Sequence, residues 1–518
     1  MKQKIQNIEN LKMKQKIQNI ENLPLIFSKL KAEGKKIVHC HGVFDLLHVG
    51  HIKHFKEAKT FGDVLVVSIT PDEFVNKGPG RPAFTTSLRL EALSELESID
   101  YVVVNKWPTA EELIEIIEPN FYCKGPDYKD HLDDITGKIT EEEGAVNSIG
   151  GKVIYTNDIT FSSSSLLNKF GNIYSKEQEL FIRNISSEHS FEAIQKRVED
   201  VSKLKVLVIG ETIIDQYVFC EALGKSGKEP VLVLQDLETQ EYLGGSLAIA
   251  RHLSSFCETV SVLSFLGENS EYQSFIEKNI EENIVLNFFN KSGSPTIVKR
   301  RFVDHIDRKK ILGVYSINDD LLEKNEEDKF IESFDKLSKE HDLVIISDYG
   351  HGIITPRIAE HISNSDKFVS LNAQVNAANI GTHNIRKYHD VNCLIINESE
   401  LRHELRKRDG NIEDMAISLK NMVNSKYIAV TQGRMGAFLI NGDTTPERSP
   451  GFAAQVIDKV GSGDALLALL SVCLYSNFDE KLSLFIGSLA AAQSVETVGN
   501  SEPASKTKLL KTISHLLK

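Results

Sequence analysis

The sequence predicts an α/β protein with two domains, each built around a mainly parallel, doubly wound sheet. The chain has 518 residues, which is far more than one ordinary hydrophobic core can organise. Short β-rich runs alternate with helical stretches from Lys35 to Thr156, and a second alternation starts at Lys205. Strands that alternate with helices of this length indicate parallel strands joined by helical crossovers.

The first alternation predicts a Rossmann-like domain over residues 25–170. Five β-rich runs are expected as strands, at 35–40, 63–69, 98–104, 120–125 and 150–156. The residues between them show helical periodicity, at 50–62, 86–96 and 110–119. Residues 1–24 precede this domain and contain "MKQKIQNIENL" twice, at 1–11 and 13–23, so Met13 is a plausible alternative initiator and we assign the repeat no function.

The second alternation predicts a larger α/β domain over residues 203–518, after a charged helical linker at 171–202. Its expected strands include "KVLVIG", "DLVIISDYG", "NCLIIN" and "YIAVTQG", and a β-rich segment at 216–243 is expected to form a small β extension. The last part of the domain is helical and rich in alanine.

Composition excludes several functional classes. A net charge of −13 argues against a general nucleic-acid binder, whose affinity depends on clustered Lys and Arg. The six cysteines show no CxxC pair, so we expect reduced thiols and neither a disulfide framework nor a zinc site. The longest apolar run, at 465–475, is too short to cross a bilayer. We therefore expect a cytoplasmic protein without membrane insertion.

The stretch "HGVFDLLHVGH" at 41–51 predicts the first chemical site. A strand ending near His41 and a helix beginning near Val49 place this turn at the carboxyl edge of the sheet, where such folds bind ligands. The helix N-terminus offers N–H groups to a phosphate, and His48 and His51 can project on one side toward it. Two imidazoles there could stabilise charge that builds on a phosphate during in-line displacement.

This region resembles the HxGH nucleotidyltransferases over about 145 residues. "KGPGRP", "LRLEAL", "KGPDY" and "FSSSSLL" follow the motif in the family order. The resemblance implies that His48 and His51 stabilise the transition state at the α-phosphate. It also implies nucleotide contacts from Gly42, Phe44, Lys53, Arg89, Lys124, Ser162 and Ser163. The glycerol-phosphate cytidylyltransferases usually carry an arginine shortly before the serine run, and its absence here favours the heptose-type adenylyltransferases. His39, His41 and His54 lack a metal-ligand pattern, so we expect them to be hydrogen-bonded neighbours.

The stretch "DKVGSGDALLALL" at 458–470 predicts the second chemical site. Glycines before a helix let backbone N–H groups converge on an anion. Asp464, in the first helical turn, is placed to take a proton from a hydroxyl that attacks the γ-phosphate of ATP.

The region 203–518 resembles the ribokinase-like carbohydrate kinases, on the segments "VLVIGETIID", "GGSLAIARHL", "SDYGHG", "NESE" and "TQGRMG". The resemblance implies an α/β fold with a small β lid and Asp464 as the base. It implies sugar contacts from Asp215, Gly244 and Gly245, an anion hole at Gly461 and Gly463, and nucleotide contacts at Thr431, Gly433 and Gly436. Asn397 and Glu400 would organise Mg²⁺, a hard cation suited to oxygen ligands.

Two departures concern the sugar site. The heptose kinases carry Asn where this chain has Ala248, and Asp-Pro-Lys where it has "LNAQ" at Leu371–Gln374. A lost amide donor changes which hydroxyls a site reads, so heptose identity does not follow from the resemblance. The stretch "NAQVNAAN" is either a polar pocket wall or an Asn-rich loop.

Together the two sites predict a bifunctional enzyme that makes a nucleotide sugar from a sugar or sugar phosphate and ATP or CTP, in the reverse domain order of the heptose enzymes. ADP-heptose synthesis is the nearest example, and the family resemblance implies Mg²⁺ and a homodimer. An alternative is a CTP-dependent cytidylyltransferase that activates a polyol phosphate for a surface glycan. A further alternative makes the C-terminal half a non-catalytic sugar-binding module.

Overall fold

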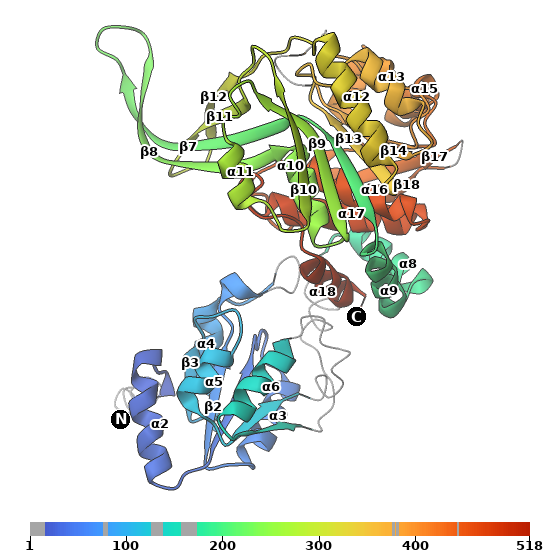
Figure 1. Cartoon of the computed structure of the whole chain (residues 1–518). Coiled ribbons are helices and arrows are strands. Elements are labelled where there is room, and N and C mark those ends of the chain that lie inside the picture. Colours follow the sequence, from blue (N-terminus) through green and yellow to red (C-terminus); the bar gives the residue numbers. More distant parts are fainter. Residues whose placement is uncertain are drawn as a thin grey trace. The chain divides into compact units, whose positions relative to one another are not determined.

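The computed structural model describes residues 16–75, 81–125, 138–156, 174–375, 379, 383–442 and 445–517 (Figure 1). The chain divides into two compact units, Met1–Ser175 with Leu510–Lys518, and Lys176–Leu509. We refer to them as the N-terminal unit and the kinase-like unit, and each is described by itself.

The N-terminal unit contains one five-stranded parallel sheet in the order β3-β2-β1-β4-β5, which confirms the predicted doubly wound fold. Its strands are β1 (Ile37–Gly42), β2 (Val64–Ile69), β3 (Tyr101–Val104), β4 (Phe121–Lys124) and β5 (Lys152–Tyr155). Its helices are η1 (Ile20–Asn22), α2 (Leu23–Ala32), α3 (Val49–Lys59), η2 (Asp72–Phe74), α4 (Thr86–Ser94), α5 (Glu111–Ile117) and α6 (Lys138–Ser148).

Both faces of this sheet are covered by helices, because alternate residues of each buried strand point to opposite sides. Val38 and Cys40 of β1 pack with Phe55 of α3, whereas Ile37 packs with Phe27 of α2 on the other face. The strand order reverses between β1 and β4, and the ligand-binding crevice of an open α/β sheet is expected at the carboxyl ends of such strands.

The second copy of the duplicated segment contributes to this unit. Ile17 forms a bridge with Val102 of β3, and Ile20 is buried in the core beside α2. The first copy lies outside the described residues.

The kinase-like unit contains a nine-stranded sheet in the order β10-β9-β6-β13-β14-β15-β16-β17-β18, parallel except at β17 and β18. The strands of this sheet are β6 (Lys205–Gly210), β9 (Thr259–Gly267), β10 (Ile284–Lys291), β13 (Leu343–Asp348), β14 (Phe368–Ala373), β15 (Cys393–Asn397), β16 (Tyr427–Thr431), β17 (Ala437–Asn441) and β18 (Glu447–Ser449).

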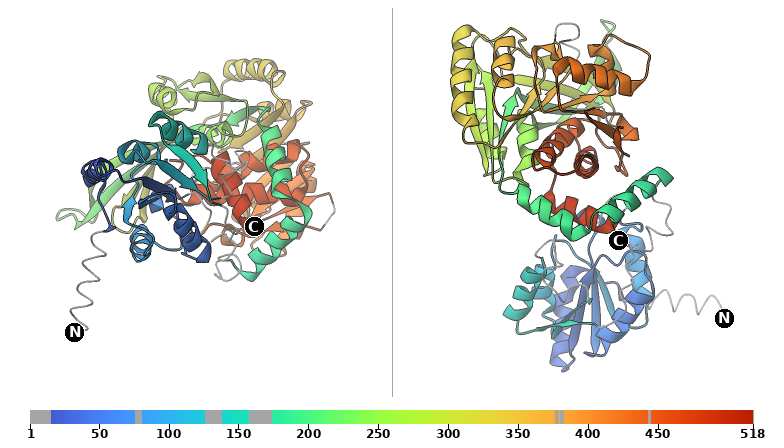
Figure 2. Two further views of the ribbon diagram at one scale, coloured as in Figure 1. Left: turned by 90° about the horizontal axis from the view of Figure 1, so that it is seen from below. Right: turned by 90° about the vertical axis from the view of Figure 1, so that its right-hand side faces the viewer.

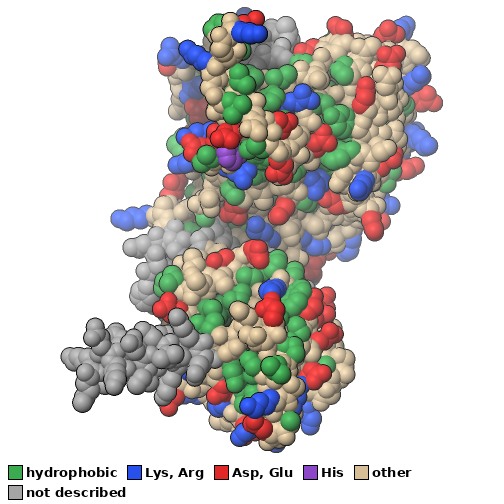
Figure 3. Space-filling model, turned by 90° about the vertical axis from the view of Figure 1, so that its left-hand side faces the viewer, with side chains coloured by type: hydrophobic (Ala, Val, Ile, Leu, Met, Phe, Trp, Pro, Cys, Tyr) green, Lys and Arg blue, Asp and Glu red, His purple; other side chains and the backbone are tan. Residues whose placement is uncertain are grey.

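A separate four-stranded sheet confirms the expected β lid. Its order is β12-β11-β7-β8, with β7 (Thr212–Lys225), β8 (Leu232–Gly245), β11 (Ile297–Asp304) and β12 (Lys310–Ser316). Strands β7 and β8 extend as a long hairpin (Figure 1). Hydrophobic side chains lie exposed among charged ones on this side of the unit (Figure 3). On β8 and β12 they include Leu232, Leu237, Leu312 and Val314.

Helices cover both faces of the nine-stranded sheet. The helices of this unit are α10 (Ser246–Ser254), α11 (Gln273–Asn279), α12 (Lys324–Ser338), α13 (Pro356–Ser363), η5 (Ile385–Lys387), α14 (Glu398–Glu404), α15 (Ile412–Val423), η6 (Gly433–Met435), α16 (Ser462–Tyr475) and α17 (Glu480–Val495). Helix α18 (Lys506–Leu516) crosses the boundary between the units, because residues from Leu510 onward belong to the N-terminal unit. The apolar helices α16 and α17 pack side by side, as the right-hand view of Figure 2 shows. No helix in the described part of the chain is long and apolar enough to cross a membrane.

The contact-based units differ from the predicted domain bounds at both ends of the kinase region. Helices α8 (Lys176–Glu188) and α9 (Phe191–Val201) occupy the predicted linker, but they belong to the kinase-like unit. Phe181 of α8 packs against Phe452 and Phe485, with ring centroids 6.0 and 5.7 Å apart. The amphipathic pattern of residues 171–202 predicts helices. It does not show which unit their apolar face packs against, so the sequence could not assign them to the kinase-like unit.

Candidate active sites

The first site is the turn between β1 and α3, at the crevice where the strand order reverses. His48 is the N-cap of α3, and its Nδ1 accepts a hydrogen bond from the Gly50 backbone N–H at 3.1 Å. The rings of His48 and His51 stack with centroids 4.0 Å apart and an interplanar angle of 28°. The structure therefore brings the two predicted imidazoles together at a helix N-terminus.

The cap hydrogen bond determines which nitrogen of His48 carries the proton. Burial lowers the pKa of His48, so the neutral ring dominates near pH 7. Since Nδ1 accepts a hydrogen bond, the proton of the neutral ring lies on Nε2. Nε2 is buried and has no hydrogen-bond partner among the described residues. His48 thus presents an N–H donor suited to a phosphate oxygen.

The turn before α3 holds a strained backbone. Phe44 and Leu46 both have φ of 47°, in the left-handed region that non-glycine residues rarely adopt. The Phe44 ring lies edge-on to His51 at 5.6 Å, and a Cβ on Gly42 would approach that ring to 3.1 Å. Asp45 accepts the backbone N–H groups of Ala83 and Phe84 at 2.7 and 3.0 Å. These contacts keep the turn in one conformation and so position the imidazoles.

Arg89 holds this turn from behind. Its guanidinium is buried, and its N–H groups reach the carbonyls of Phe84, Val43 and Thr70 at 2.9, 2.6 and 2.9 Å. The remaining contacts are to Asp72 at 2.6 Å and to Thr86 at 3.3 Å. All five N–H donors have protein acceptors, so the predicted triphosphate contact would require at least one of these bonds to be exchanged.

The other predicted nucleotide residues of this unit lie in three settings. Lys124, at the end of β4, forms a buried ion pair with Glu142 at 2.6 Å. Lys53 is exposed on α3. Ser162 and Ser163 lie outside the described residues.

The neighbouring histidines are hydrogen-bonded, as predicted. His39 and His41 both contact the Ser68 hydroxyl, at 2.7 and 2.8 Å. His54 contacts the Thr156 hydroxyl at 3.0 Å.

The second site is centred on Asp464, in the first turn of α16. Asp464 Oδ1 accepts a hydrogen bond from the Tyr349 hydroxyl at 2.9 Å. The pKa of Asp464 is raised to about 7, mainly by burial and in part by the charge of Asp215, whereas the Tyr349 hydrogen bond and Lys299 oppose this rise. A carboxylate with this pKa is suited to accept a proton at neutral pH.

Two glycines shape the turn that precedes Asp464, where the sequence predicts an anion hole. Gly461 is the N-cap of α16 with φ of 91°, and a Cβ there would meet Asn500 Oδ1 at 2.0 Å. A Cβ on Gly463 would meet no atom within 4 Å. Asp458 anchors the turn, because it accepts hydrogen bonds from Tyr217 and Lys310, each at 2.6 Å.

Residues of the predicted sugar site meet beside Asp464. Asp215 Oδ1 pairs with Arg301 at 2.5 Å, and Asp215 Oδ2 accepts from Asn500 at 3.4 Å. A Cβ on Gly244 would lie 2.4 Å from Asp215 Oδ2, and one on Gly245 would lie 2.2 Å from a backbone carbonyl. Gly244 therefore allows close packing against the Asp215 carboxylate, and Gly245 against the Glu211 backbone.

Sequence analysis missed three residues of this site: Tyr349, Lys299 and Arg301. Lys299 is buried with its ammonium 4.9 Å from the centre of the Tyr349 ring, and burial lowers its pKa. Lys299 and Arg301 lie two residues apart on β11, so their side chains point to the same face of the strand. The sequence of this strand contains no recognisable motif. Tyr349 lay inside the recognised "SDYGHG" segment, but its contact with Asp464 spans 115 residues of sequence.

Asn397 and Glu400, the predicted metal residues, form the capping box of α14. Asn397 Oδ1 accepts the Glu400 N–H at 2.8 Å, and Glu400 Oε2 accepts the Asn397 N–H at 3.1 Å. Burial raises the pKa of Glu400 to about 7, and Asp464 contributes to this rise. The two acidic groups are therefore electrostatically coupled.

The predicted nucleotide loop joins β16 to β17. Thr431 ends β16, and Gly433 begins the exposed turn η6 with φ of 60°. Gly436 has φ of 90°, and a Cβ there would meet the Ser449 carbonyl at 2.0 Å. This glycine is required by backbone packing whether or not a nucleotide is bound.

The two departures from the heptose pattern lie in the core. Ala248 is buried in α10, and Leu371 and Ala373 are buried in β14. The amide of Asn372 donates to the Ile395 carbonyl at 2.8 Å, and that of Asn379 donates to the Tyr349 and Gln374 carbonyls. The amides of these two residues therefore hold the backbone in place.

The residues of the two sites are of the kinds expected in a carbohydrate kinase and in a nucleotidyltransferase. Residues 203–507 match the pfkB family of carbohydrate kinases, and residues 39–170 match the cytidylyltransferase-like family. The kinase match covers more than half of the chain, so the chain belongs to the pfkB carbohydrate kinase family.

Curated relatives include several proteins named bifunctional protein HldE. The bifunctional protein HldE of Campylobacter jejuni (strain RM1221) is 28% identical over 301 residues, which cover 58% of this chain and 62% of that protein. HldE of Aliarcobacter butzleri (strain RM4018) is 42% identical over 128 residues, which cover 24% of this chain and 26% of that protein. Each alignment spans less than two thirds of the relative.

Among solved structures, a ribokinase from Thermotoga maritima is 19% identical with a TM-score of 0.46. The alignment covers 59% of this chain and 98% of the ribokinase.

Proposed function

We propose that this chain is a bifunctional enzyme of nucleotide-sugar synthesis that phosphorylates a sugar or sugar phosphate and then transfers a nucleotide to a sugar 1-phosphate. The observation that carries the proposal is that two separate helix N-termini each bring together side chains suited to phosphate chemistry. One holds the stacked His48–His51 pair, and the other holds Asp464 with a pKa of about 7. The similarity to HldE proteins supports the combination.

In the kinase step, Asp464 accepts the proton of the acceptor hydroxyl, whose oxygen attacks the γ-phosphorus of ATP, and ADP leaves. Tyr349 holds the carboxylate in place through its hydroxyl. The N–H groups of the Gly461–Gly463 turn are positioned to bind the phosphate charge that develops during transfer.

Mg²⁺ fits the donor set near this site, because Asn397 and Glu400 offer oxygen atoms, the ligands that this ion prefers. These residues would hold the ion directly or through water. When bound, Mg²⁺ neutralises phosphate charge.

In the nucleotidyl step, an oxygen of the sugar 1-phosphate attacks the α-phosphorus of ATP or CTP, and pyrophosphate leaves. His48 donates its Nε2–H to the phosphate oxygens, and His51, stacked on it, lies beside the same helix N-terminus. No covalent enzyme intermediate is needed, since positioned donors supply the stabilisation.

A crossed pair of variants tests the assignment. Asp464→Asn is expected to abolish ADP formation with the sugar acceptor and to leave pyrophosphate release unchanged. His51→Ala is expected to do the reverse. If Asp464→Asn consumes ATP as fast as the wild type with every acceptor that the wild type phosphorylates, the kinase role of Asp464 is wrong. A wild type that phosphorylates no member of a broad sugar and sugar-phosphate panel favours a sugar-binding module.

The same pyrophosphate assay shows whether the nucleotidyl step uses ATP or CTP. We expect pyrophosphate release with ATP and a sugar 1-phosphate, on the similarity to HldE. Release with CTP alone would replace the adenylyl proposal with a CTP-dependent enzyme acting on a polyol phosphate or a sugar phosphate.

We also propose a homodimer, which the exposed hydrophobic side chains of the four-stranded sheet support. Light scattering should give twice the chain mass. Leu312→Lys on β12 should reduce the mass to that of one chain, whereas Leu180→Lys on α8, equally exposed and hydrophobic, should not.

A further inference from the structure

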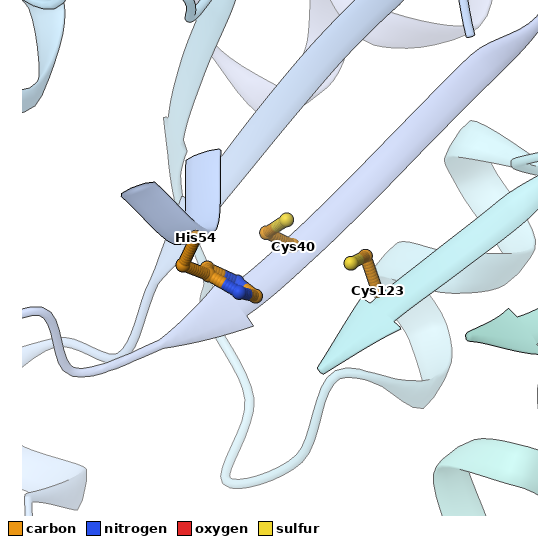
Figure 4. A group of neighbouring side chains, drawn as sticks. All are labelled: Cys40, His54 and Cys123. Carbon is orange, nitrogen blue, oxygen red and sulfur yellow. The ribbon is translucent and has the colours of Figure 1, made fainter. Parts of the chain in front are cut away.

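Three side chains that are far apart in the sequence meet beneath the nucleotidyl site. Cys40 of β1, Cys123 of β4 and His54 of α3 each offer one ligand atom, and these atoms all lie within 4.8 Å of one another. Figure 4 shows the His54 ring reaching toward the sulfur atoms carried by the two strands. The two cysteines are fully buried and are paired residues of neighbouring parallel strands.

The register of the sheet explains why the two thiols converge. Cys40 and Cys123 are opposite each other on β1 and β4, and both point to the face that α3 covers. His54 lies three residues after His51, one helical turn further into α3. The cluster therefore lies directly below the crevice that holds the imidazole pair.

The histidine is already oriented by a second contact. Its Nδ1 lies 3.0 Å from the hydroxyl of Thr156, which is itself buried and hydrogen-bonded to the Lys124 carbonyl. Such a contact on one ring nitrogen is what fixes a metal-ligating histidine in place. A bound ion would then be coordinated through Nε2.

We propose that Cys40, Cys123 and His54 form a binding site for a thiophilic transition-metal ion, with Zn²⁺ as the expected occupant. Two thiolates and one imidazole match the ligand preferences of Zn²⁺ and disfavour Mg²⁺ and Ca²⁺, which take oxygen ligands. The site is separate from the oxygen-donor residues Asn397 and Glu400, and it does not depend on the proposed function.

The distances are compatible with coordination. With Zn–S bonds of about 2.3 Å, two sulfur ligands of a tetrahedral ion lie about 3.8 Å apart. Since the ligand atoms lie within 4.8 Å of one another, closing by about 1 Å or less completes the geometry. A small rotation of the cysteine side chains suffices.

Charge balance also favours a divalent ion. The Cys40 thiol lies in an apolar core, and burial raises its pKa well above the usual range. Two lone thiolates would be unstable there, but two thiolates with one divalent cation are neutral. Metal binding would therefore release two protons, and affinity should rise with pH.

The ion would have a structural role. It would link β1, β4 and α3, which together position the turn that carries His48 and His51. Zn²⁺ takes four ligands in a structural site, so a fourth ligand would complete the three that these residues supply.

The test begins with the intact wild-type chain, reduced and purified without added metal. Elemental analysis should find about one Zn²⁺ per chain. After metal removal, Co²⁺ titration should produce thiolate-to-cobalt charge-transfer absorption in the near ultraviolet and tetrahedral d–d bands in the visible range. Both signals should saturate at about one equivalent.

Variants then locate the site. Cys40→Ala and Cys123→Ala should each lose the charge-transfer band, whereas Cys257→Ala, a buried cysteine of the kinase-like unit, should keep it. His54→Gln should weaken Zn²⁺ binding about 10-fold or more. Circular dichroism and the thermal transition of each variant establish that it is folded.

The wild-type measurements decide the matter even if a cysteine variant misfolds. Absence of both bound Zn²⁺ and Co²⁺ absorption in the reduced wild type would overturn the proposal. A charge-transfer band that persists in folded Cys40→Ala and Cys123→Ala would place the metal elsewhere and would overturn it too. A Cys40–Cys123 disulfide found by mass spectrometry in the protein before reduction would identify the pair as a redox element instead.

Discussion

Asp464 and His48 show how contacts with neighbouring groups control the protonation state of a reacting side chain. Asp464 can accept a proton only as a carboxylate, and burial raises its pKa to about 7. His48 keeps its donor proton on Nε2 because Nδ1 accepts a hydrogen bond from Gly50. In both sites, the protonation state of the side chain is therefore set by its surroundings: burial for Asp464 and the Gly50 N–H group for His48.

The raised pKa of Asp464 predicts the pH dependence of the kinase reaction. The active carboxylate is protonated below its pKa, so kcat/KM should fall as pH decreases through about 7 and should reach a plateau above it. Initial rates of ADP formation between pH 5 and pH 9 measure this. In Asp464→Asn the residual rate should be at least about 100-fold lower and should lack this limb. If the variant still shows the fall in kcat/KM at low pH, that fall arises from the protonation of another group.

Tyr349 should act as a positioning residue for Asp464. The Tyr349 hydroxyl donates a hydrogen bond to Asp464 Oδ1 at 2.9 Å, and this bond lowers the pKa of the carboxyl. Tyr349→Phe removes the hydroxyl, so the pKa of Asp464 should rise. The acid limb of kcat/KM should therefore move to higher pH, with little change in KM for the sugar. Tyr315→Phe, which alters another tyrosine ring near Lys299, is the matched control and should leave the profile unchanged. A uniformly lower rate with the same pH profile would indicate only a structural role.

At the level of single elements, helix N-termini carry both sites, and their capping residues differ. The N-cap of α3 is His48, which also has a role in the proposed reaction, whereas the N-cap of α16 is Gly461, whose positive φ and close packing require a glycine. In each unit, local backbone geometry therefore links helix stability to the proposed phosphate binding.

His48 substitutions can separate the two roles. His48→Asn keeps an N-cap acceptor and should leave the stability of the N-terminal unit near wild type, whereas His48→Ala should lose about 1 kcal/mol. Both should slow pyrophosphate release by about 100-fold or more, because the Nε2 donor is lost. Denaturant unfolding and initial rates measure the two effects. If the two variants have the same free energy of unfolding, His48 does not stabilise α3 as an N-cap.

The two glycines before Asp464 should respond differently to alanine. Gly461→Ala introduces a Cβ 2.0 Å from Asn500 Oδ1 at φ of 91°, so it should lower the melting temperature of the kinase-like unit. Gly463→Ala meets open space, so it should fold normally. It should nevertheless raise KM for ATP, because the added methyl group occupies the proposed phosphate position. A Gly463→Ala enzyme with unchanged ATP kinetics would place the phosphates elsewhere.

For the whole molecule, the division into two compact units predicts two unfolding transitions. Residues of each unit have their own hydrophobic core, so each unit should melt cooperatively. Differential scanning calorimetry should show two peaks, with His48→Ala shifting only one and Gly461→Ala only the other. A single peak moved by both variants would show that the units unfold together.

Local sequence was sufficient to predict the fold class and the positions of both chemical motifs. Alternating strands and helices have short-range periodicity, and a phosphate site at a helix N-terminus needs only a few consecutive residues, such as those around His48 or Gly461. The packing of α8 and α9 was not predictable in the same way, because their apolar faces specify burial without naming the surface that buries them.

The sequence by itself determined two doubly wound α/β units, the imidazole pair and the carboxylate base, since each depends on neighbouring residues in the chain. Only the tertiary structure decided which distant groups join them. The Tyr349–Asp464 and Arg301–Asp215 contacts span 115 and 86 residues, and Cys40, His54 and Cys123 meet through the register of β1 with β4. Strand register and helix packing are long-range properties, and no short motif encodes them.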